Sequence, residues 1–523
     1  MSTNERRVFG IDLGTTNSCI ACSSEHGDPE VIPNLDSDLT TPSVVYFESH
    51  DNIPIGKIAK RYAIARPELV CSYVKREMAK EPQHVRTLTY HGRDYSPEAV
   101  SALILSKVVG DARQNLTVPP AVPTRAVITV PAHFGAIGKN ATLQAGKLAG
   151  IDVLYVAPEP VAAAIAYGFQ RLNEIQTVLV YDLGGGTFDV TVVETDGASA
   201  KVIALDGERT LGGLNWDEDI VNWIRQSMRD AHAVDLPLDD LALKQQLMGK
   251  AEEAKQELSR FNKTLLAIEF QGKPYAFDLT VKDFEAITKV RLESTIDKTK
   301  AVIEQAREKG VTKIDRLLLV GGSSKMPAVA RRLQEETQLV PVLTDPDLIV
   351  AKGAALLADL IQKGEFQVDL TGQADVRSPE LRPVIMLTPK SLGIEAHDPR
   401  THRDLVRYLV PKNSELPAKG TATFGTYEDS QRQIHVRIYE ERGEVSESPD
   451  DNTLLHETPV DLPSGLRAGS PIEVTFRVDD AGVLHVFLNE PASGKTWEID
   501  VDKFSTVTND DVLRLKPARD AVV

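Results

Sequence analysis

The sequence predicts a mixed α/β protein in two parts, an α/β unit followed by an all-β unit. Three observations support this prediction. Short apolar strand patterns alternate with helical patterns as far as about residue 360. A strand ending in Asp-Leu-Gly occurs twice within that stretch. Beyond it, apolar and polar residues alternate in several short runs, which is typical of strands with one buried face.

The α/β part begins with an apolar strand at residues 8–12 that ends in a glycine-rich turn. Further strands are predicted at residues 126–131, 177–182 and 317–322. Between the strands, apolar residues recur at helical spacing, for example at i, i+3, i+4 and i+8 from Val100. This alternation of strands and helices predicts an α/β domain over residues 1–371.

A polar, turn-rich stretch predicts an interdomain linker at residues 372–387. Three alternating runs follow it, at residues 434–438, 472–478 and 497–501. Short alternating strands of this kind predict a β-sandwich over residues 388–505. The tail at residues 506–523 is expected to hold one short helix, at residues 508–519.

The 523 residues carry a net charge of −17, and 42% of them are hydrophobic. This composition fits a globular protein, and the charge disfavours nucleic acids and membrane surfaces as partners. We find no apolar signal segment and no apolar run that could span a bilayer, so a cytoplasmic protein is expected. We interpret Cys19 and Cys22 as packing thiols, because a zinc site would need two further ligands at suitable spacing.

Two matched glycine-rich turns are the most specific chemical signal in the chain. Residues 10–16 and 181–187 both end a strand with Asp-Leu-Gly and continue with small or hydroxyl residues. Glycine lets backbone amides face a phosphate with no Cβ in the way, and threonine hydroxyls add hydrogen bonds. Asp12 and Asp182 would hold a hydrated Mg²⁺, which prefers oxygen ligands. The two copies predict two related lobes that clamp one nucleotide.

Longer motifs resemble those of the DnaK-class, seventy-kilodalton heat-shock chaperones. They include Gly10-Ile-Asp-Leu-Gly-Thr-Thr-Asn-Ser, Tyr181-Asp-Leu-Gly-Gly-Gly-Thr-Phe-Asp and Val320-Gly-Gly-Ser-Ser-Lys-Met-Pro. Ile128-Thr-Val-Pro-Ala-His-Phe and Thr388-Pro-Lys-Ser-Leu-Gly-Ile-Glu narrow the resemblance to chaperones within the wider actin and sugar-kinase superfamily. The resemblance covers roughly residues 8–505. It implies a two-lobed, actin-like ATPase domain built on an RNase H-like repeat, followed by a β-sandwich that binds peptide.

The same resemblance implies roles for individual residues at the phosphate end of the site. The carboxylates around Mg²⁺ and the attacking water correspond to Asp12, Glu159, Asp182 and Asp189. Lys75 corresponds to the lysine beside the γ-phosphate. The phosphate contacts correspond to Gly14, Thr15, Thr16, Asn17, Gly184, Gly185, Gly186 and Thr187. The implied ligands are ATP or ADP with Mg²⁺, and K⁺ is a further candidate ion.

The adenosine site is predicted partly by helical spacing. Glu252, Lys255 and Ser259 stand at i, i+3 and i+7, so they share one helix face, which would ordinarily be a solvated charged face. The resemblance implies that this face forms one side of the adenosine-binding site, called the adenosine wall below. It would be completed by Gly321, Gly322, Ser323, Lys325 and Asp347.

The resemblance also implies a peptide site and a relay between the domains. A pocket for one aliphatic side chain would be lined by Ile394, Phe424, Ile434 and Val436, although strand alternation alone would make these residues ordinary core. The peptide backbone would be arched over by His397 and Tyr427. Pro131 and Lys139 resemble the interdomain relay. Implied partners are unfolded polypeptide segments, a J-domain co-chaperone and a nucleotide exchange factor.

The sequence departs from the family in four places. The chain stops at Val523, where the family continues into a helical lid, so weak binding and rapid exchange of peptide are expected. Arg382-Pro-Val-Ile-Met replaces a leucine run in the linker. Tyr155 stands where an arginine usually pairs with the J-domain. Residues 135–138 read Gly-Ala-Ile-Gly in place of a more polar stretch, and Gln256 replaces the arginine or aliphatic residue that usually covers the adenine.

The sequence therefore predicts an ATPase chaperone in which nucleotide binding and peptide binding are linked reciprocally. A second hypothesis is a regulatory or exchange-factor-like relative that binds ATP but hydrolyses little of it. The intact set of Lys75, Glu159, Asp182 and Asp189 favours hydrolysis. A sugar kinase or actin-like filament protein is disfavoured, because neither has a use for the predicted β-sandwich.

Overall fold

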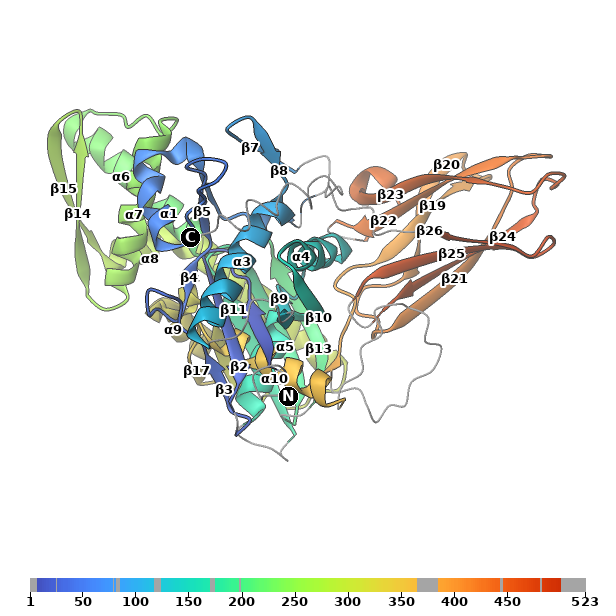
Figure 1. Ribbon diagram of the computed structural model, residues 1–523, viewed down its shortest axis with the longest axis horizontal. Helices are drawn as coiled ribbons and strands as arrows, with labels where there is room; N and C mark the ends of the chain where they lie inside the picture. The colour runs from blue at the N-terminus through green and yellow to red at the C-terminus, as the bar shows by residue number, and fades with distance from the viewer. Residues whose placement is uncertain are drawn as a thin grey trace.

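The computed structural model describes residues 7–24, 26–78, 80, 85–116, 124–169, 175–196, 199–364, 384–442, 445–479 and 482–499. Most of the predicted linker lies outside these ranges, as do Arg382 and the helix expected at residues 508–519. An α/β part reaches residue 364, and an all-β part runs from residue 384 to residue 499 (Figure 1). Within the described ranges, no helix is long and apolar enough to cross a membrane.

Two six-stranded sheets form the core of the α/β part, the second completed by one strand from the start of the all-β part, and their first five strands follow the same order. The first sheet runs β10 (Ile151–Pro158), β9 (Thr124–Val130), β1 (Val8–Asp12), β2 (Asn17–Ser23) and β3 (Pro29–Val31), with β4 (Thr41–Pro42) beside β2. The second runs β17 (Pro341–Leu343), β16 (Arg316–Val320), β11 (Gln176–Leu183), β12 (Phe188–Thr195), β13 (Ala200–Glu208) and β18 (Val384–Ile385).

The strand directions also match between the two sheets. In each, three neighbouring strands are parallel, and the third forms an antiparallel hairpin with the strand that follows it in sequence. Asp12 is the last residue of β1 and Asp182 the last but one of β11, so the two carboxylates occupy equivalent places. The repeated Asp-Leu-Gly motif therefore coincides with a repeat in topology.

Some helices of the α/β part pack on the two sheets, and others lie to one side with the hairpin of residues 263–280 (Figure 1). They are α1 (Lys57–Ala65), α2 (Lys75–Met78), α3 (Pro97–Asn115), α4 (Ala136–Leu148), α5 (Glu159–Phe169), α6 (Gly213–His232), α7 (Leu241–Leu258), α8 (Val281–Glu308), α9 (Pro327–Thr337) and α10 (Ile349–Lys363). Smaller elements are the hairpins β5 (Val44–Tyr46) with β6 (Val70–Ser72), β7 (Leu88–Tyr90) with β8 (Arg93–Tyr95) and β14 (Lys263–Phe270) with β15 (Lys273–Thr280), and the 3-10 turns η2 (Pro67–Leu69), η4 (Gly322–Lys325) and η6 (Pro449–Asp451).

Side-chain caps fix the starts of three long helices. The Ser96 hydroxyl accepts a hydrogen bond from the Ala99 amide, and Pro97 occupies the first position of α3. Asp240 caps α7 by accepting from two amides. Thr280 and Asp283 form a reciprocal capping box at the start of α8. These caps satisfy amides that have no partner inside the helix.

Helix α10 lies against the first sheet at a distance that only glycine allows. A Cβ on Gly10 would lie 2.0 Å from the Ala355 amide nitrogen of α10, and one on Gly353 would lie 1.8 Å from the Ala162 carbonyl oxygen of α5. Both approaches are to backbone atoms, which cannot move aside as a flexible side chain could. The close packing holds β1, and with it Asp12, rigidly against α10.

The all-β part consists of two four-stranded antiparallel sheets. One has the order β20 (Arg403–Val410), β19 (Leu392–Asp398), β22 (Gln433–Glu441), β23 (Asn452–Asp461). The other has the order β21 (Ala418–Gly425), β24 (Pro471–Val478), β25 (Leu484–Glu490), β26 (Lys495–Ile499). Alternate residues of β24 are buried, as the sequence pattern predicts. The same alternation is found in β25, and the buried residues of both sheets share one core cluster.

The three cysteines are buried free thiols, on β2 and β6. Burial raises the pKa of Cys71 to about 11, so this thiol stays protonated at neutral pH. Among the described residues, no group of three or more His, Cys, Asp or Glu side chains forms a metal-binding cluster. The cysteines thus behave as small apolar core residues.

Candidate functional site

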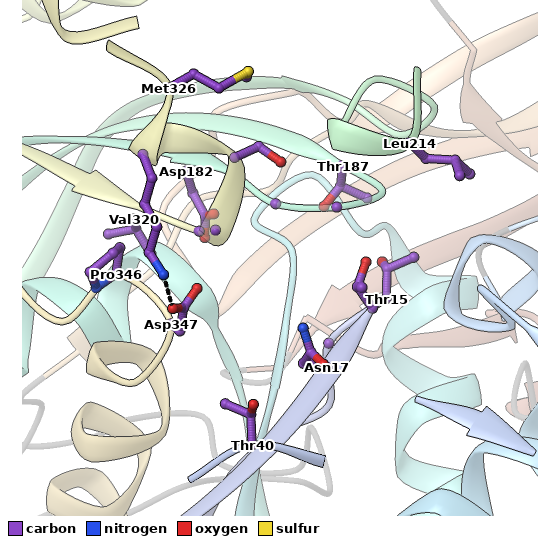
Figure 2. Close-up of a pocket in the computed structure, with 18 of the residues that line it drawn as sticks. Thr15, Asn17, Thr40, Asp182, Thr187, Leu214, Val320, Met326, Pro346 and Asp347 are labelled. Carbon is purple, nitrogen blue, oxygen red and sulfur yellow. Dashed lines mark hydrogen bonds and ion pairs between the residues drawn. The ribbon is translucent and has the colours of Figure 1, made fainter. Parts of the chain in front are cut away.

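A cavity of about 570 Å³ opens between the two large sheets. Its wall combines the turns after β1 and β11 with the start of α2, one face of α7 and the turn η4. Figure 2 shows residues from all around it, including Thr15, Asp182 and Asp347. All the predicted nucleotide-site residues line this cavity except Asp189 and Gly186. Residues far apart in the sequence therefore meet in one place.

The two glycine-rich turns face each other across the cavity. A Cβ on Gly185 would lie 1.9 Å from the Thr16 hydroxyl, and one on Gly186 would lie 2.4 Å from Thr15 Cγ2. Glycine is therefore required at both positions for the turns to approach this closely. Gly186 contacts the opposite turn instead of the cavity, which explains why it does not line the wall. Thr15 and Thr187 both line the cavity, one from each turn (Figure 2).

A buried ion pair stands beside these turns. Lys75, at the start of α2, donates to Glu159, at the start of α5, with 2.5 Å between Lys75 Nζ and Glu159 Oε1. Lys75 is 4% exposed and its Nζ lies 5.9 Å from the centre of the Phe134 ring. Burial opposes the charge of Lys75, but the neighbouring Glu159 and Asp12 carboxylates outweigh burial and raise the pKa of this amine. The lysine therefore remains a fixed positive charge.

Carboxylates outnumber cations at this end of the cavity. Burial raises the pKa of Asp12 and raises that of Glu159 to about 7, and Asp182 is raised well above its ordinary value by burial and by repulsion from Glu159 and Asp189. Burial is the largest cause of each shift, so the charged forms of these carboxyls are poorly stabilised even beside Lys75. A divalent cation would stabilise those charged forms.

This donor set fits Mg²⁺ held mainly through water. The described carboxylates do not converge as three direct ligands, and Mg²⁺ typically takes one or two carboxylates and keeps several waters besides substrate phosphate oxygens. Asp12 and Asp182 both line the cavity, and the Asp12 carboxylate is oriented by a 3.1 Å hydrogen bond from the Thr129 hydroxyl. Asp12 and Asp182, one from each copy of the repeated motif, could together hold the hydrated ion.

Asp189 lies just behind the cavity wall, where His133 holds it. Its Oδ1 accepts from the His133 backbone amide at 3.1 Å and lies 2.6 Å from His133 Nδ1. The imidazole Nε2 is buried and has no hydrogen-bond partner among the described residues. A Cβ on Gly207 would lie 2.7 Å from His133 Nδ1, so this glycine makes room for the ring. Sequence reasoning quoted His133 within a motif but assigned it no role.

The predicted adenosine wall is held in place by charged contacts. Lys255 pairs with Asp217 at 2.7 Å and donates to the Gly213 carbonyl, while Ser259 donates to the Lys255 carbonyl. Glu252 accepts from Lys60 of α1 at 2.7 Å, a contact that joins the two sides of the cavity. On the other side, Asp347 (Figure 2) pairs with Lys325 of η4.

Several lining residues were missed by sequence reasoning. They include Thr40, Tyr73, Leu214, Asp217, Arg260, Met326, Leu343, Pro346 and Val350. Most are apolar or lone charged residues with no motif around them, so no sequence signal identifies them. Burial raises the pKa of Asp217 to about 6 although Lys255 opposes this, which is typical of a carboxylate in a functional cleft.

The predicted peptide-site residues come together in the all-β part. Ile394 and Val436 are buried in its core, and Phe424 and Ile434 pack against that core. The rings of His397 and Tyr427 meet edge to face with centroids 5.5 Å apart, so the pair predicted to form an arch is in contact. His397 Nδ1 also lies 2.9 Å from Asp404 Oδ1.

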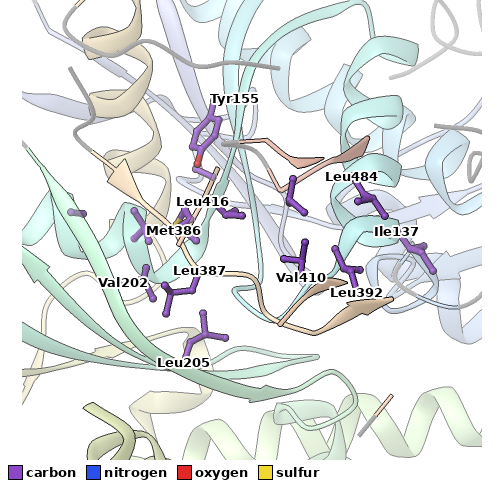
Figure 3. Packing of buried hydrophobic residues seen from close by; sticks show 14 of the residues in the cluster. Ile137, Tyr155, Val202, Leu205, Met386, Leu387, Leu392, Val410, Leu416 and Leu484 are labelled. Carbon is purple, nitrogen blue, oxygen red and sulfur yellow. The ribbon is translucent and has the colours of Figure 1, made fainter. Parts of the chain in front are cut away.

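The all-β part contacts the α/β part through a shared apolar cluster, seen in Figure 3. Ile137, Tyr155, Val202 and Leu205 come from the α/β part and meet Met386, Leu387, Leu392, Val410, Leu416 and Leu484. Strand β18 extends the second sheet by pairing in parallel with β13. Tyr155, which stands where the family's arginine pairs with the J-domain, is 2% exposed and belongs to this apolar cluster.

Charged residues are buried in the same contact. Glu440 of β22 is 2% exposed, lies 3.0 Å from Lys390 Nζ and 3.7 Å from Arg209 of the α/β part. A Cβ on Gly135 would lie 2.0 Å from Glu440 Oε1, which explains one glycine of the unusual Gly-Ala-Ile-Gly stretch. The other, Gly138, leaves space for the Phe134 ring.

The two predicted relay residues flank this region. Pro131 follows β9, and its carbonyl accepts from the Phe134 amide at 3.1 Å. Lys139 of α4 is 3% exposed, and burial lowers its pKa to about 8 although Asp479 and Glu440 of the all-β part oppose the shift. Lys139 therefore reports directly on whether the two parts are in contact.

A comparison with known families accounts for this combination of features. The family model described as Hsp70 protein matches residues 8–521, which is nearly the whole chain. The match includes both the α/β part with its cavity and the all-β part. The chain thus belongs to the Hsp70 protein family.

Proposed function

We propose that this protein is an ATP-dependent chaperone that hydrolyses ATP between the two lobes of an actin-like domain, residues 1–371. A β-sandwich domain, residues 388–505, binds extended hydrophobic segments of unfolded proteins. The observation that carries the proposal is the buried Lys75–Glu159 pair beside two facing glycine turns and two cavity-lining aspartates. That arrangement suits a phosphoryl group, which needs positioning and charge neutralisation more than a nucleophilic side chain.

Each group at the phosphate end has a role that its geometry supports. The amides and hydroxyls of the two turns hold the phosphate oxygens, and Lys75 neutralises charge that accumulates on them. Mg²⁺, when bound, neutralises further phosphate charge. Glu159 lines the cavity and orients the attacking water. Asp189, which His133 holds just behind the wall, acts on that water through the neighbouring Glu159 and Asp182 carboxylates. Water attacks the γ-phosphorus, the bond to the β-phosphate oxygen breaks, and the products are ADP and phosphate.

Coupling between ATP and peptide uses the contact between the two parts. A ligand shifts an equilibrium only when it binds the two states with different affinity, and the effect is reciprocal. His133 and Phe134 are adjacent in sequence, so the Asp189 environment and the Gly135–Glu440 contact lie at two ends of one short segment. Movement of that segment would connect the nucleotide cavity to the all-β part.

The proposal is tested by steady-state ATP hydrolysis, measured with and without an excess of an unstructured, leucine-rich peptide. Hydrolysis that increases with peptide and disappears in Lys75→Ala supports a coupled chaperone. A His397→Ala/Tyr427→Ala double variant serves as the matched control, because it removes the ring contact without touching the cavity. It should hydrolyse ATP at the basal rate and respond less to peptide. Hydrolysis that persists unchanged in Lys75→Ala would contradict the assigned chemistry.

A further inference from the structure

Tyr73 lines the nucleotide cavity and has no role in the function derived so far. It lies in the short connection between β6 and α2, two residues before Lys75. Lys60 of α1 and Arg76 of α2 reach from the same side of the cavity to Glu252 and to the Gly186 carbonyl on the other side. Tyr73 is therefore placed where the two sides of the cavity meet.

The backbone of Tyr73 is in an unfavourable conformation. Its φ of 61° is left-handed, a region that residues with a large side chain seldom adopt. The surrounding elements impose this conformation, because β6 is paired to β5, Lys75 is held by Glu159, and the Tyr73 carbonyl accepts from the Arg76 amide at 3.1 Å. Such strained residues concentrate at ligand sites, where the unusual backbone conformation sets the direction of a side chain. Here that conformation makes Tyr73 part of the cavity lining.

The charged groups nearest the phenol are Glu252 of the predicted adenosine wall and Asp217 of α6, both of which line the cavity together with Tyr73. Burial, with Glu252 and Asp217 as the strongest neighbouring charges, raises the pKa of the Tyr73 phenol. The hydroxyl therefore stays protonated and able to donate and accept hydrogen bonds. Asp217 is held by Lys255, and Glu252 by Lys60. The phenol thus shares the cavity with two acidic groups, one on α7 and one on α6.

This environment selects one part of a nucleotide. Lys255 and Lys60 are already engaged by these two carboxylates and are not offered to a phosphate, and the phosphates have their own site at the glycine turns beside Lys75. An uncharged group with hydroxyls can donate to Glu252 and accept from a neutral phenol. In a nucleotide that group is the sugar. Leu214, which lines the cavity from the start of α6, adds an apolar surface but no hydrogen bond.

We propose that Tyr73 is a nucleotide-positioning residue that binds a hydroxyl of the ribose, from the side of the cavity opposite Glu252. The inference rests on the proposed ATP-binding function and deepens it. Tyr73 would join the two sides of the cavity through the bound sugar and slow the release of nucleotide. It would take no part in breaking the phosphate bond.

The test compares Tyr73→Phe with the unaltered protein by isothermal titration calorimetry with ATP, 2′-deoxy-ATP and 3′-deoxy-ATP in the presence of Mg²⁺. Loss of one hydrogen bond should weaken ATP binding roughly 3- to 10-fold. The loss should vanish with the deoxy nucleotide that lacks the contacted hydroxyl and persist with the other. The KM for ATP should rise while kcat at saturating ATP is unchanged. Tyr62→Phe, on exposed α1, is the matched control and should change neither quantity.

Two results would overturn the inference. Equal weakening for all three nucleotides would show that Tyr73 only supports the fold of the cavity. Unchanged ATP affinity in Tyr73→Phe would show that the phenol makes no contact with the sugar. Failure of the unaltered protein to bind ATP would instead contradict the proposed function itself, and this inference with it. Tyr73→Gly separates the backbone from the side chain: it permits the left-handed conformation without strain, yet ATP binding should weaken at least as much as in Tyr73→Phe.

Discussion

The nucleotide cavity and the contact between the two parts both bury charge, but they neutralise it differently. In the cavity, Asp12, Glu159 and Asp182 share one buried lysine, and their pKa values are raised. In the contact, Glu440 lies between Lys390 and Arg209, and its pKa is lowered despite its burial. The cavity is thus electrostatically incomplete without a ligand, whereas the contact is complete within the protein. Ligand binding should therefore change the charge balance of the cavity more than that of the contact. Mutation of a charged residue should disturb the contact more, because each charge there already has its partner.

Removal of Lys75 should have the largest effect and should be confined to the cavity. Lys75→Ala leaves several carboxylates in a buried site with no cation, so ATP hydrolysis should fall at least 100-fold. The contact between the two parts does not involve Lys75 and should persist. Hydrolysis assays and small-angle scattering test the two statements separately. An expanded particle in Lys75→Ala would show that the two regions are not independent.

Glu440→Ala should break the contact and spare the cavity. Removing the buried Glu440 takes a carboxylate away from partly buried Lys390, at a cost of about 3–5 kcal/mol. We expect a larger radius of gyration and unchanged ATP affinity. The neighbouring Glu441→Gln is the matched control, because Glu441 accepts from the Ser391 amide within the all-β part. Undocking in both variants would mean that general destabilisation, not Glu440, is responsible.

The contact should also respond to pH through Lys139. Its pKa is about 8 when the parts are in contact and returns toward 10.5 when they separate. Between pH 8 and pH 10.5, Lys139 is protonated in the separated form and largely deprotonated in the contacting form. The free energy that favours contact should therefore increase over this range, by roughly 3 kcal/mol in total. Scattering profiles recorded across this range measure the change. The same series in Lys139→Met should be flat; a persisting slope would assign the effect to another group.

Gly135→Ala should have a smaller effect of the same kind. The Cβ of the new alanine would lie 2.0 Å from Glu440 Oε1, so Glu440 would have to move. That movement should weaken the contact between the two parts by about 1–3 kcal/mol. Gly110→Ala is the control within a helix, because its Cβ would meet nothing within 4 Å. That change should stabilise α3 by up to about 1 kcal/mol. A contact of unchanged strength in Gly135→Ala, read from scattering, would mean that Glu440 can move aside freely.

The cavity could be predicted from the sequence far better than the contact. Gly14, Gly185 and Asp182 are found because local geometry at a phosphate restricts residue type and spacing together. Glu440 and Gly135 are more than 300 positions apart, and no local pattern relates a carboxylate on a strand to a glycine before a helix. Tyr73 was missed for a related reason, since neither its left-handed backbone nor its acidic neighbours have a sequence signature.

The predicted all-β strands illustrate the same limit. The alternation at residues 472–478 identifies β24 correctly, because each buried side chain follows from the pleat. It does not show which strands would face the α/β part. Leu392, Val410 and Leu484 lie in the contact, yet they carry the same apolar signal as residues inside the all-β core.

The apolar cluster around Tyr155 and Met386 has a thermal consequence. Burial of apolar surface lowers the heat capacity, so the free energy of contact is a curved function of temperature with an optimum. On cooling below that optimum the hydrophobic contribution weakens, while the ionic contribution of Glu440 does not weaken in the same way. The ionic contacts of Glu440 should therefore account for more of the contact free energy in the cold, and the apolar cluster for more of it in the warm. Temperature should thus change the contact between the two parts as well as the stability of the folded chain.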